Sequence, residues 1–159
     1  MTNRRQQGIT LLSLIFALII VAVVASIATA AYTGYVQQSR LKKVEGSLVV
    51  VQNAIRNFGE DQNTYAGICN AASVLVIQVP GKDSNFTYQC LSTPTATKYS
   101  VGAVGVCPGR FCGLTLAFSY LGPSKGYEES TPSVPTGWNK PTKTCWIAGS
   151  DGTCSTAQF

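Results

Sequence analysis

The chain has 159 residues, a length that accommodates one globular domain and a terminal extension. Charged residues make up 12% of it, about half the ~25% that is usual for globular domains. The net charge is +5 and falls to +3 when Arg4 and Arg5 are set aside, which excludes the dense basic patch of a dedicated nucleic-acid-binding protein. Histidine is absent, so the commonest general base and metal ligand are missing, and most hydrolase sites with them.

An uncharged and mostly apolar run covers Ile9 to Ala31, 23 residues in all, and follows Arg4 and Arg5. About 20 apolar residues in a helix cross the hydrocarbon core of a bilayer, so the run predicts a transmembrane helix. A secretory signal is the alternative, because the small residues "ATA" at 28–30 resemble a signal-peptidase site. The first 32 residues do not decide between the two.

The residues beyond Tyr32 favour a retained helix. Apolar residues recur at intervals of three and four, which places them on one stripe of an α-helix: Leu41, Val44, Leu48, Val51, Ile55 and Phe58. Polar residues fall mostly off this stripe: Arg40, Lys42, Lys43, Glu45, Gln52, Asn53 and Arg56. No proline interrupts the pattern, so we predict one helix from Ile9 to Phe58 that stops near Gly59. A discarded signal does not need to be the first half of a continuous helix.

After Phe58 the sequence predicts strands and turns. Five segments have strand character: 73–79, 86–90, 99–106, 112–120 and 144–148. Residues 121–143 contain four prolines and predict a long exposed loop. The expected fold class is α+β, in which the long N-terminal helix packs through the 41–58 stripe on an antiparallel β-sheet head.

Several short motifs resemble those of the type IV pilins and their minor-pilin relatives. "GITLL" at 8–12 is similar to a prepilin cleavage junction, and Tyr32 and Tyr35 align with a tyrosine pair of that family. "NTYAGIC", "ATKYSVGAVG", "CGLTLAFSYLGPSKG" and the late "CW" resemble one branch of it. The resemblance covers nearly the whole chain and is most specific at the leader.

The resemblance implies a domain organisation and a function. Residues 1–8 would be the prepilin leader, 9–35 the transmembrane and polymerisation stalk, and 36–159 the globular head, with an amphipathic half-helix at 36–58 and the sheet and C-terminal loops at 59–159. A prepilin peptidase would cut between Gly8 and Ile9, and Ile9 would be N-methylated. The expected product is a structural subunit, not an enzyme, with no cofactor and no metal.

The resemblance also implies partners and a location. The expected partners are other pilin subunits, the prepilin peptidase and the pilus assembly machinery. The precursor would lie in the bacterial inner membrane and the mature protein in an extracellular pilus. An alternative is a soluble secreted domain, rich in disulfides, that signal peptidase releases near Ala30.

One residue departs from the family pattern. The fifth residue after the expected cut is usually glutamate in this family, and here it is Ser13. A serine hydroxyl cannot pair as an anion with the α-amine of a neighbouring subunit in an apolar core. Ser13 therefore favours a minor or end-placed subunit for adhesion or DNA capture, or a system that pairs the α-amine in another way. Simple divergence of a bulk subunit is the remaining alternative.

All six cysteines follow the apolar segment: Cys69, Cys90, Cys107, Cys112, Cys145 and Cys154. An even number in the exported part predicts disulfides formed in an oxidising compartment, and six cysteines allow 15 connectivities. The resemblance implies a Cys112–Cys145 pair that bounds a C-terminal loop region. For the others we favour Cys69–Cys90 and Cys107–Cys154.

The proline-rich segment supplies a candidate interaction surface. It combines cations with aromatic side chains, a composition suited to DNA, a surface glycan or a neighbouring subunit: Lys125, Tyr127, Trp138, Lys140 and Lys143. The adjacent Glu128 and Glu129 are expected to be solvated charges and not an acid/base pair. "SDGT" at 150–153 predicts a turn.

Overall fold

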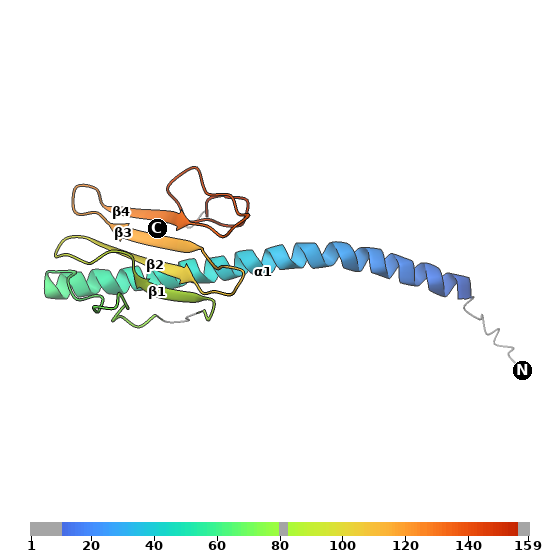
Figure 1. Ribbon diagram of the computed structural model, residues 1–159, viewed down its shortest axis with the longest axis horizontal. Helices are drawn as coiled ribbons and strands as arrows, with labels where there is room; N and C mark the ends of the chain where they lie inside the picture. The colour runs from blue at the N-terminus through green and yellow to red at the C-terminus, as the bar shows by residue number, and fades with distance from the viewer. Residues whose placement is uncertain (1–10, 80–82, 156–159) are drawn as a thin grey trace, which may run out of the picture. The chain divides into compact units, whose positions relative to one another are not determined.

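A computed structural model of the protein describes residues 11–79 and 83–155 (Figure 1). One helix and a four-stranded sheet make an α+β fold, as expected. The elements in chain order are α1 (Leu11–Gln62), β1 (Phe86–Cys90), β2 (Tyr99–Gly105), β3 (Thr115–Tyr120) and β4 (Tyr127–Ser133). The chain divides into two compact units, residues 1–36 and 37–159, which we call the N-terminal unit and the C-terminal unit.

Helix α1 is continuous over 52 residues, which confirms the predicted unbroken helix. It ends at Gln62, past the stop expected near Gly59. Gly59 lies inside the helix, where a Cβ at this position would overlap the ring of Tyr65. The helix ends instead before Asn63, whose φ of 54° is the left-handed conformation common at helix C-termini.

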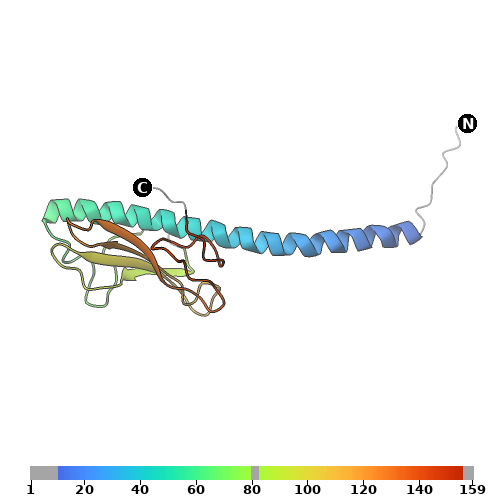
Figure 2. The ribbon, with the colours of Figure 1, turned by 90° about the horizontal axis from the view of Figure 1, so that it is seen from above.

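The sheet is antiparallel throughout, with the strand order β1-β2-β3-β4. From residue 37 onward, α1 lies along one face of this sheet (Figure 2). The predicted stripe provides the helix side of the core, since Leu41, Val44, Leu48, Val51 and Ile55 are at most 1% exposed. Burying five such side chains, each worth about 1.5–3 kcal/mol, holds the second half of α1 on the sheet.

Three predicted strands are confirmed, at β1, β2 and β3. In β3 the expected alternation holds for Leu116 and Phe118, which are buried beside the half-buried Thr115 and Ser119. Ala117 on the other face is also buried. Its carbonyl accepts a 2.7 Å hydrogen bond from Nε1 of Trp146, so the C-terminal region covers part of β3.

Two predicted strands are wrong. Residues 73–79 form only isolated bridges, Cys69 with Leu75 and Val74 with Gln89. Ser73, the first residue of this segment, has a φ of 60°, which is left-handed and not extended, and the Asn70 side chain accepts hydrogen bonds from two nearby backbone amides. Residues 144–148 form a single bridge, between Ile147 and Cys154.

The proline-rich segment 121–143 is not wholly a loop, because β4 forms within it. β4 pairs with β3 on one side and is an edge strand of the four-stranded sheet. The register shifts between Thr115 and Ala117, whose partners are Ser133 and Ser130. Pro132 lies inside this irregularity, where a missing N–H does not break a regular ladder.

All six cysteines form disulfides, and two of the three pairings differ from those expected. The structure contains Cys69–Cys90, as expected, together with Cys107–Cys112 and Cys145–Cys154. The expected Cys112–Cys145 and Cys107–Cys154 pairs are wrong because each partner has a nearer cysteine across a short turn. One short loop joins β2 to β3, and the other closes a small C-terminal hairpin.

Candidate assembly helix and disulfide-closed C-terminal region

The described part of the N-terminal unit is a helix with apolar side chains on every face. None of its leucine, isoleucine, valine or phenylalanine side chains between residues 11 and 29 is buried, and Leu11 is 76% exposed and Ile27 68% exposed. By length and composition this part of α1 is able to cross a membrane. An apolar surface of this extent is stable only when lipid or protein covers it.

The polar side chains on this helix do not require water. The hydroxyl of Ser26 donates to the carbonyl of Val23 at 2.7 Å, and the hydroxyl of Thr29 donates to the carbonyl of Ser26 at 3.0 Å. Bonds of this kind satisfy a hydroxyl inside the helix, as an apolar environment demands. Ser13 lies near the start of α1, while Gly8 and Ile9 lie outside the described residues.

In the C-terminal unit, two polar residues of α1 that were expected off the apolar stripe are buried. Glu45 is 4% exposed and Gln52 is 7% exposed. The Oε2 atom of Glu45 accepts a 2.7 Å hydrogen bond from the hydroxyl of Ser155. Burial raises the pKa of Glu45, while the bond from Ser155 and the charge of Lys42 partly offset it. Glu45 therefore ties the end of the described chain to α1.

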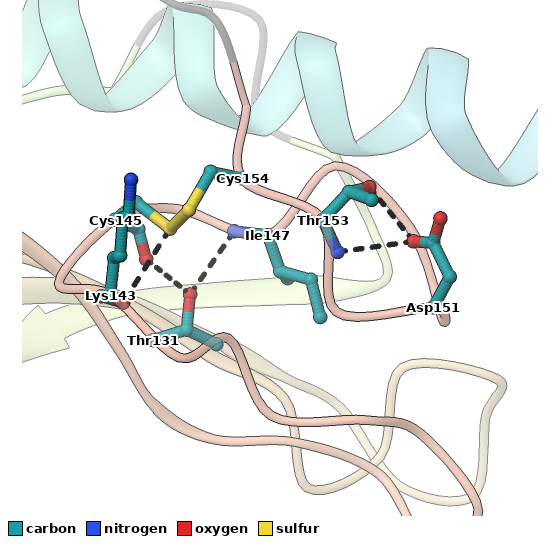
Figure 3. Close-up of a disulfide and its surroundings, with 7 residues drawn as sticks. All are labelled: Thr131, Lys143, Cys145, Ile147, Asp151, Thr153 and Cys154. Atoms are coloured by element: carbon teal, nitrogen blue, oxygen red, sulfur yellow. Dashed lines mark hydrogen bonds between the residues drawn. A yellow bond between two sulfur atoms is a disulfide. The ribbon is translucent and has the colours of Figure 1, made fainter.

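The C-terminal region is organised around the Cys145–Cys154 disulfide (Figure 3). The hydroxyl of Thr131 donates to the carbonyl of Cys145 at 2.9 Å and accepts from the amide of Ile147 at 3.1 Å. One side chain of β4 thus supplies both hydrogen bonds that a neighbouring strand would supply. Sequence patterns did not reveal this role, since an isolated threonine in a polar segment carries no such signal.

The expected turn at 150–153 is confirmed. The Oδ1 atom of Asp151 accepts from the amide of Thr153 at 3.2 Å and from its hydroxyl at 2.8 Å (Figure 3). These bonds lower the pKa of Asp151. In the described ranges 11–79 and 83–155, no group of three or more His, Cys, Asp or Glu side chains is placed to hold a metal ion.

The two aromatic residues of the candidate interaction surface pack on other rings of the C-terminal unit. Tyr127 stacks on Phe118 with ring centroids 5.4 Å apart, and the guanidinium of Arg56 lies 5.2 Å from its ring centroid. Trp138 contacts the ring of Phe111 edge-on. Both aromatic side chains are thus engaged within the C-terminal unit.

The three lysines of that candidate surface remain exposed. Lys125 lies in the turn between β3 and β4. Lys140 donates from Nζ to the carbonyl of Pro132 at 3.0 Å. Lys140 and Lys143 together line a groove of about 270 Å³ beside β4.

Glu128 and Glu129 differ from the solvated pair expected. Both line a pocket of about 380 Å³ between α1 and β4, together with Gln52, Arg56 and the rings of Phe118 and Tyr127. Burial and the charge of Glu45 raise the pKa of Glu129 to about 7. The carboxyl of Glu129 therefore titrates near neutral pH.

Comparison with known proteins identifies the N-terminal segment. Residues 3–29 match the family described as the prokaryotic N-terminal methylation motif. The chain carries a type IV prepilin motif. No curated protein and no solved structure matches the chain. The prepilin motif is characteristic of structural precursors and includes Gly8, Ile9 and Ser13, whereas residues 30–159 lie outside the match.

Proposed function

We propose that this protein is a structural subunit of a type IV pilus. Its leader is cut after Gly8, Ile9 is N-methylated, and the apolar helix of the N-terminal unit then assembles into or onto a helical filament. The prepilin motif at residues 3–29 carries the proposal. Other pilin subunits, the prepilin peptidase and the assembly machinery are the partners it requires.

The continuity of α1 favours this processing over release by signal peptidase. A cut after Ala30 would sever α1, which has no break between Leu11 and Gln62. In the precursor, the retained apolar segment would lie in the inner membrane. In the fibre, it would pack between neighbouring subunits. Its side chains then avoid water at both stages, which is the condition for a stable helix that is apolar on every face.

The mass of the intact mature chain tests the cleavage and the methylation together. We expect loss of residues 1–8, addition of one methyl group at Ile9, and the oxidised mass of three disulfides. A mature chain that begins at Ala31 would overturn the proposal. Tandem fragmentation of the N-terminal peptide locates the methyl group.

A matched pair of leucine variants separates the two proteases. Gly8→Leu should leave the precursor uncut, because the peptidase requires the glycine of the prepilin motif. Ala30→Leu removes the "ATA" site while keeping the helix apolar, and it should be processed like the natural chain. The opposite result, with only Ala30→Leu uncut, would assign the protein to signal peptidase.

Ser13 supports a second candidate, a minor subunit at the end of the fibre that serves adhesion or DNA capture. A subunit inside the fibre would bring its apolar segment against neighbouring N-termini, and Ser13 supplies no carboxylate for their α-amines. The copy number in sheared filaments distinguishes the two roles. A bulk subunit dominates the preparation, whereas an end-placed one is present at a small fraction of another pilin. Ser13→Glu should raise that fraction if the missing carboxylate limits incorporation.

A further inference from the structure

We propose that Arg40, Lys42 and Lys43 form a basic collar that binds anionic phospholipid headgroups while the helix is in the membrane. The proposal rests on the proposed function, because it requires that the N-terminal unit enters a bilayer. It adds a lipid class and a set of residues that the prepilin motif, which ends at residue 29, does not include.

The collar occupies the first charged positions of α1. No charged residue occurs between Leu11 and Ser39, so Arg40 is the first charge on the described helix. Tyr32 and Tyr35 precede it, are 68% and 71% exposed, and lie three residues apart on one helix face. Tyrosines at the end of an apolar span favour the bilayer interface. At ~1.5 Å per residue, Arg40 follows Tyr35 by about 8 Å along the axis, within reach of the headgroup layer.

The collar residues point away from the core of the C-terminal unit. Leu41 and Val44 are fully buried against the sheet, whereas Arg40, Lys42 and Lys43 are exposed. Long basic side chains at the end of a membrane span extend along the interface toward the phosphates. Because these side chains are exposed, their charged ends are available to lipid.

Few negative charges compete for the collar. Glu45, the nearest acidic residue on α1, is buried and bonded to Ser155. Asp83 is a second neighbouring carboxylate: burial acts to raise its pKa, but hydrogen bonds from Asn85 and the charges of Lys43 and Arg40 outweigh it and lower the pKa. Asp151 is a third, since its Oδ1 and the Nε2 of Gln38 both lie within 4 Å of the position that a Cβ at Gly149 would take. Asp83 and Asp151 against three cations leave the collar positive, and a cation near an anionic membrane surface is attracted to it.

A second copy of the chain could also supply carboxylates to the collar, but its position favours lipid. The collar begins nine residues after the apolar run ends at Ala31, about 13 Å along the helix at ~1.5 Å per residue, from which long basic side chains reach the polar headgroup layer of a bilayer. The experiment below treats protein contact as the competing outcome.

Spin-labelled lipids measure the preference of the full chain for anionic over neutral phospholipids in vesicles. The protein is reconstituted in phosphatidylcholine vesicles, and the relative association constant of spin-labelled phosphatidylglycerol over phosphatidylcholine is read from the immobilised fraction. We expect a preference of about threefold or more at low salt. The triple variant Arg40→Gln, Lys42→Gln, Lys43→Gln should lower the ratio to about one, since glutamine keeps helix propensity while removing charge.

A matched control removes the same charge elsewhere. Lys125→Gln, Lys140→Gln, Lys143→Gln should keep the natural preference, because these lysines lie in the β3–β4 turn and beside β4. Equal loss in both variants would overturn the collar in favour of a net-charge effect. An unchanged ratio in the collar variant, with weaker chemical crosslinking between copies, would assign the residues to a subunit contact instead.

The failure of this inference is distinguishable from the failure of the proposed function. Protein that alkaline carbonate strips from the vesicles is not inserted, and that result would overturn the membrane stage on which both depend. Inserted protein without headgroup preference would overturn the collar alone.

Discussion

The two halves of α1 have the same helical backbone, but the side chains of the first half are exposed and one stripe of the second half is buried. Between Leu11 and Ile27 the large apolar side chains are exposed on every face, whereas from Leu41 to Ile55 one stripe is completely buried. The first half is apolar all round, and the second is amphipathic. The contrast shows that helix formation and helix burial are separate properties: the sheet covers the second half, whereas the first half requires lipid or another protein surface to cover it.

The largest expected effect comes from truncating the buried stripe. Leu48→Ala should lower the free energy of unfolding of the C-terminal unit by about 3–4 kcal/mol, because the side chain is 1% exposed and leaves a cavity. The matched variant Leu18→Ala, at a 61% exposed position, should leave that unfolding unchanged. Thermal denaturation of the full chain in detergent measures both. Equal destabilisation would remove the distinction between the two halves.

Removing disulfides one at a time tests how much each contributes to the stability of the C-terminal unit. In the chain-entropy model, replacing Cys69 and Cys90 by serine costs about 3 kcal/mol, since the residues are 21 apart. Replacing Cys107 and Cys112, only five residues apart, costs about 2 kcal/mol. Urea denaturation of the two double variants measures the difference. The reverse order would show that the longer loop is already restrained in the unfolded chain.

The pH dependence of stability tests the buried carboxyls beside α1. The pKa of Glu129 is about 7 in the folded protein and near the ordinary glutamate value of 4.5 in the unfolded chain, and burial also raises the pKa of Glu45. A raised pKa means that the folded state binds more protons than the unfolded state between these values. Its stabilising contribution is therefore complete below about pH 4.5 and is lost as the pH rises through about 7.

We expect the free energy of unfolding to fall by about 1–2 kcal/mol over this window, a figure reduced for the partial exposure of Glu129. Urea denaturation at pH 4.5, 6 and 7.5 measures it. Glu129→Gln should flatten most of the dependence, and the exposed Glu60→Gln should not. A free energy of unfolding that rises with pH over this window in the natural chain would contradict the burial of these carboxyls.

The smallest expected effects concern glycines of α1. Gly46→Ala meets no atom within 4 Å and should stabilise the C-terminal unit by about 0.5–1 kcal/mol. Gly59→Ala should destabilise it by about 1 kcal/mol or more, because the new methyl group overlaps the Tyr65 ring. Differential scanning calorimetry compares the two. Stabilisation by both would show that Tyr65 moves freely and that Gly59 is an ordinary helix position.

Local patterns predicted the elements that depend on local physics. The three-and-four spacing from Leu41 to Ile55 predicted the buried stripe, and the apolar strand at Thr115–Tyr120 was recognisable by its alternation. The run at 73–79 was misleading: its first residue, Ser73, has a left-handed backbone, and only Val74 and Leu75 form bridges. Strand β4 escaped prediction because it is polar and contains Pro132, which a central strand would not tolerate but an irregular edge does.

In the candidate site, too, some features were predictable from local sequence and others depended on the tertiary structure. The leader junction at Gly8 and Ile9 is a contiguous motif, and residues 3–29 were recognisable without a fold. The surroundings of Glu45 and Glu129 were not recognisable from the sequence. The two carboxyls come close to each other only because β4 and the C-terminal hairpin pack against α1. The disulfide partners were equally hidden, because they depend on which turns bring cysteines together.

By itself, the sequence determined that one helix would form, which stripe of its second half would be buried, and that its first half would need an apolar environment. Those properties follow from spacing and composition along a continuous segment. Only the tertiary structure decided the pairing of Cys107 with Cys112 and of Cys145 with Cys154, the burial of Glu45 and the place of β4. Each of these depends on contacts or turn geometry that no local periodicity encodes, because the free energy that selects them arises only when the sheet, the hairpin and the helix come together.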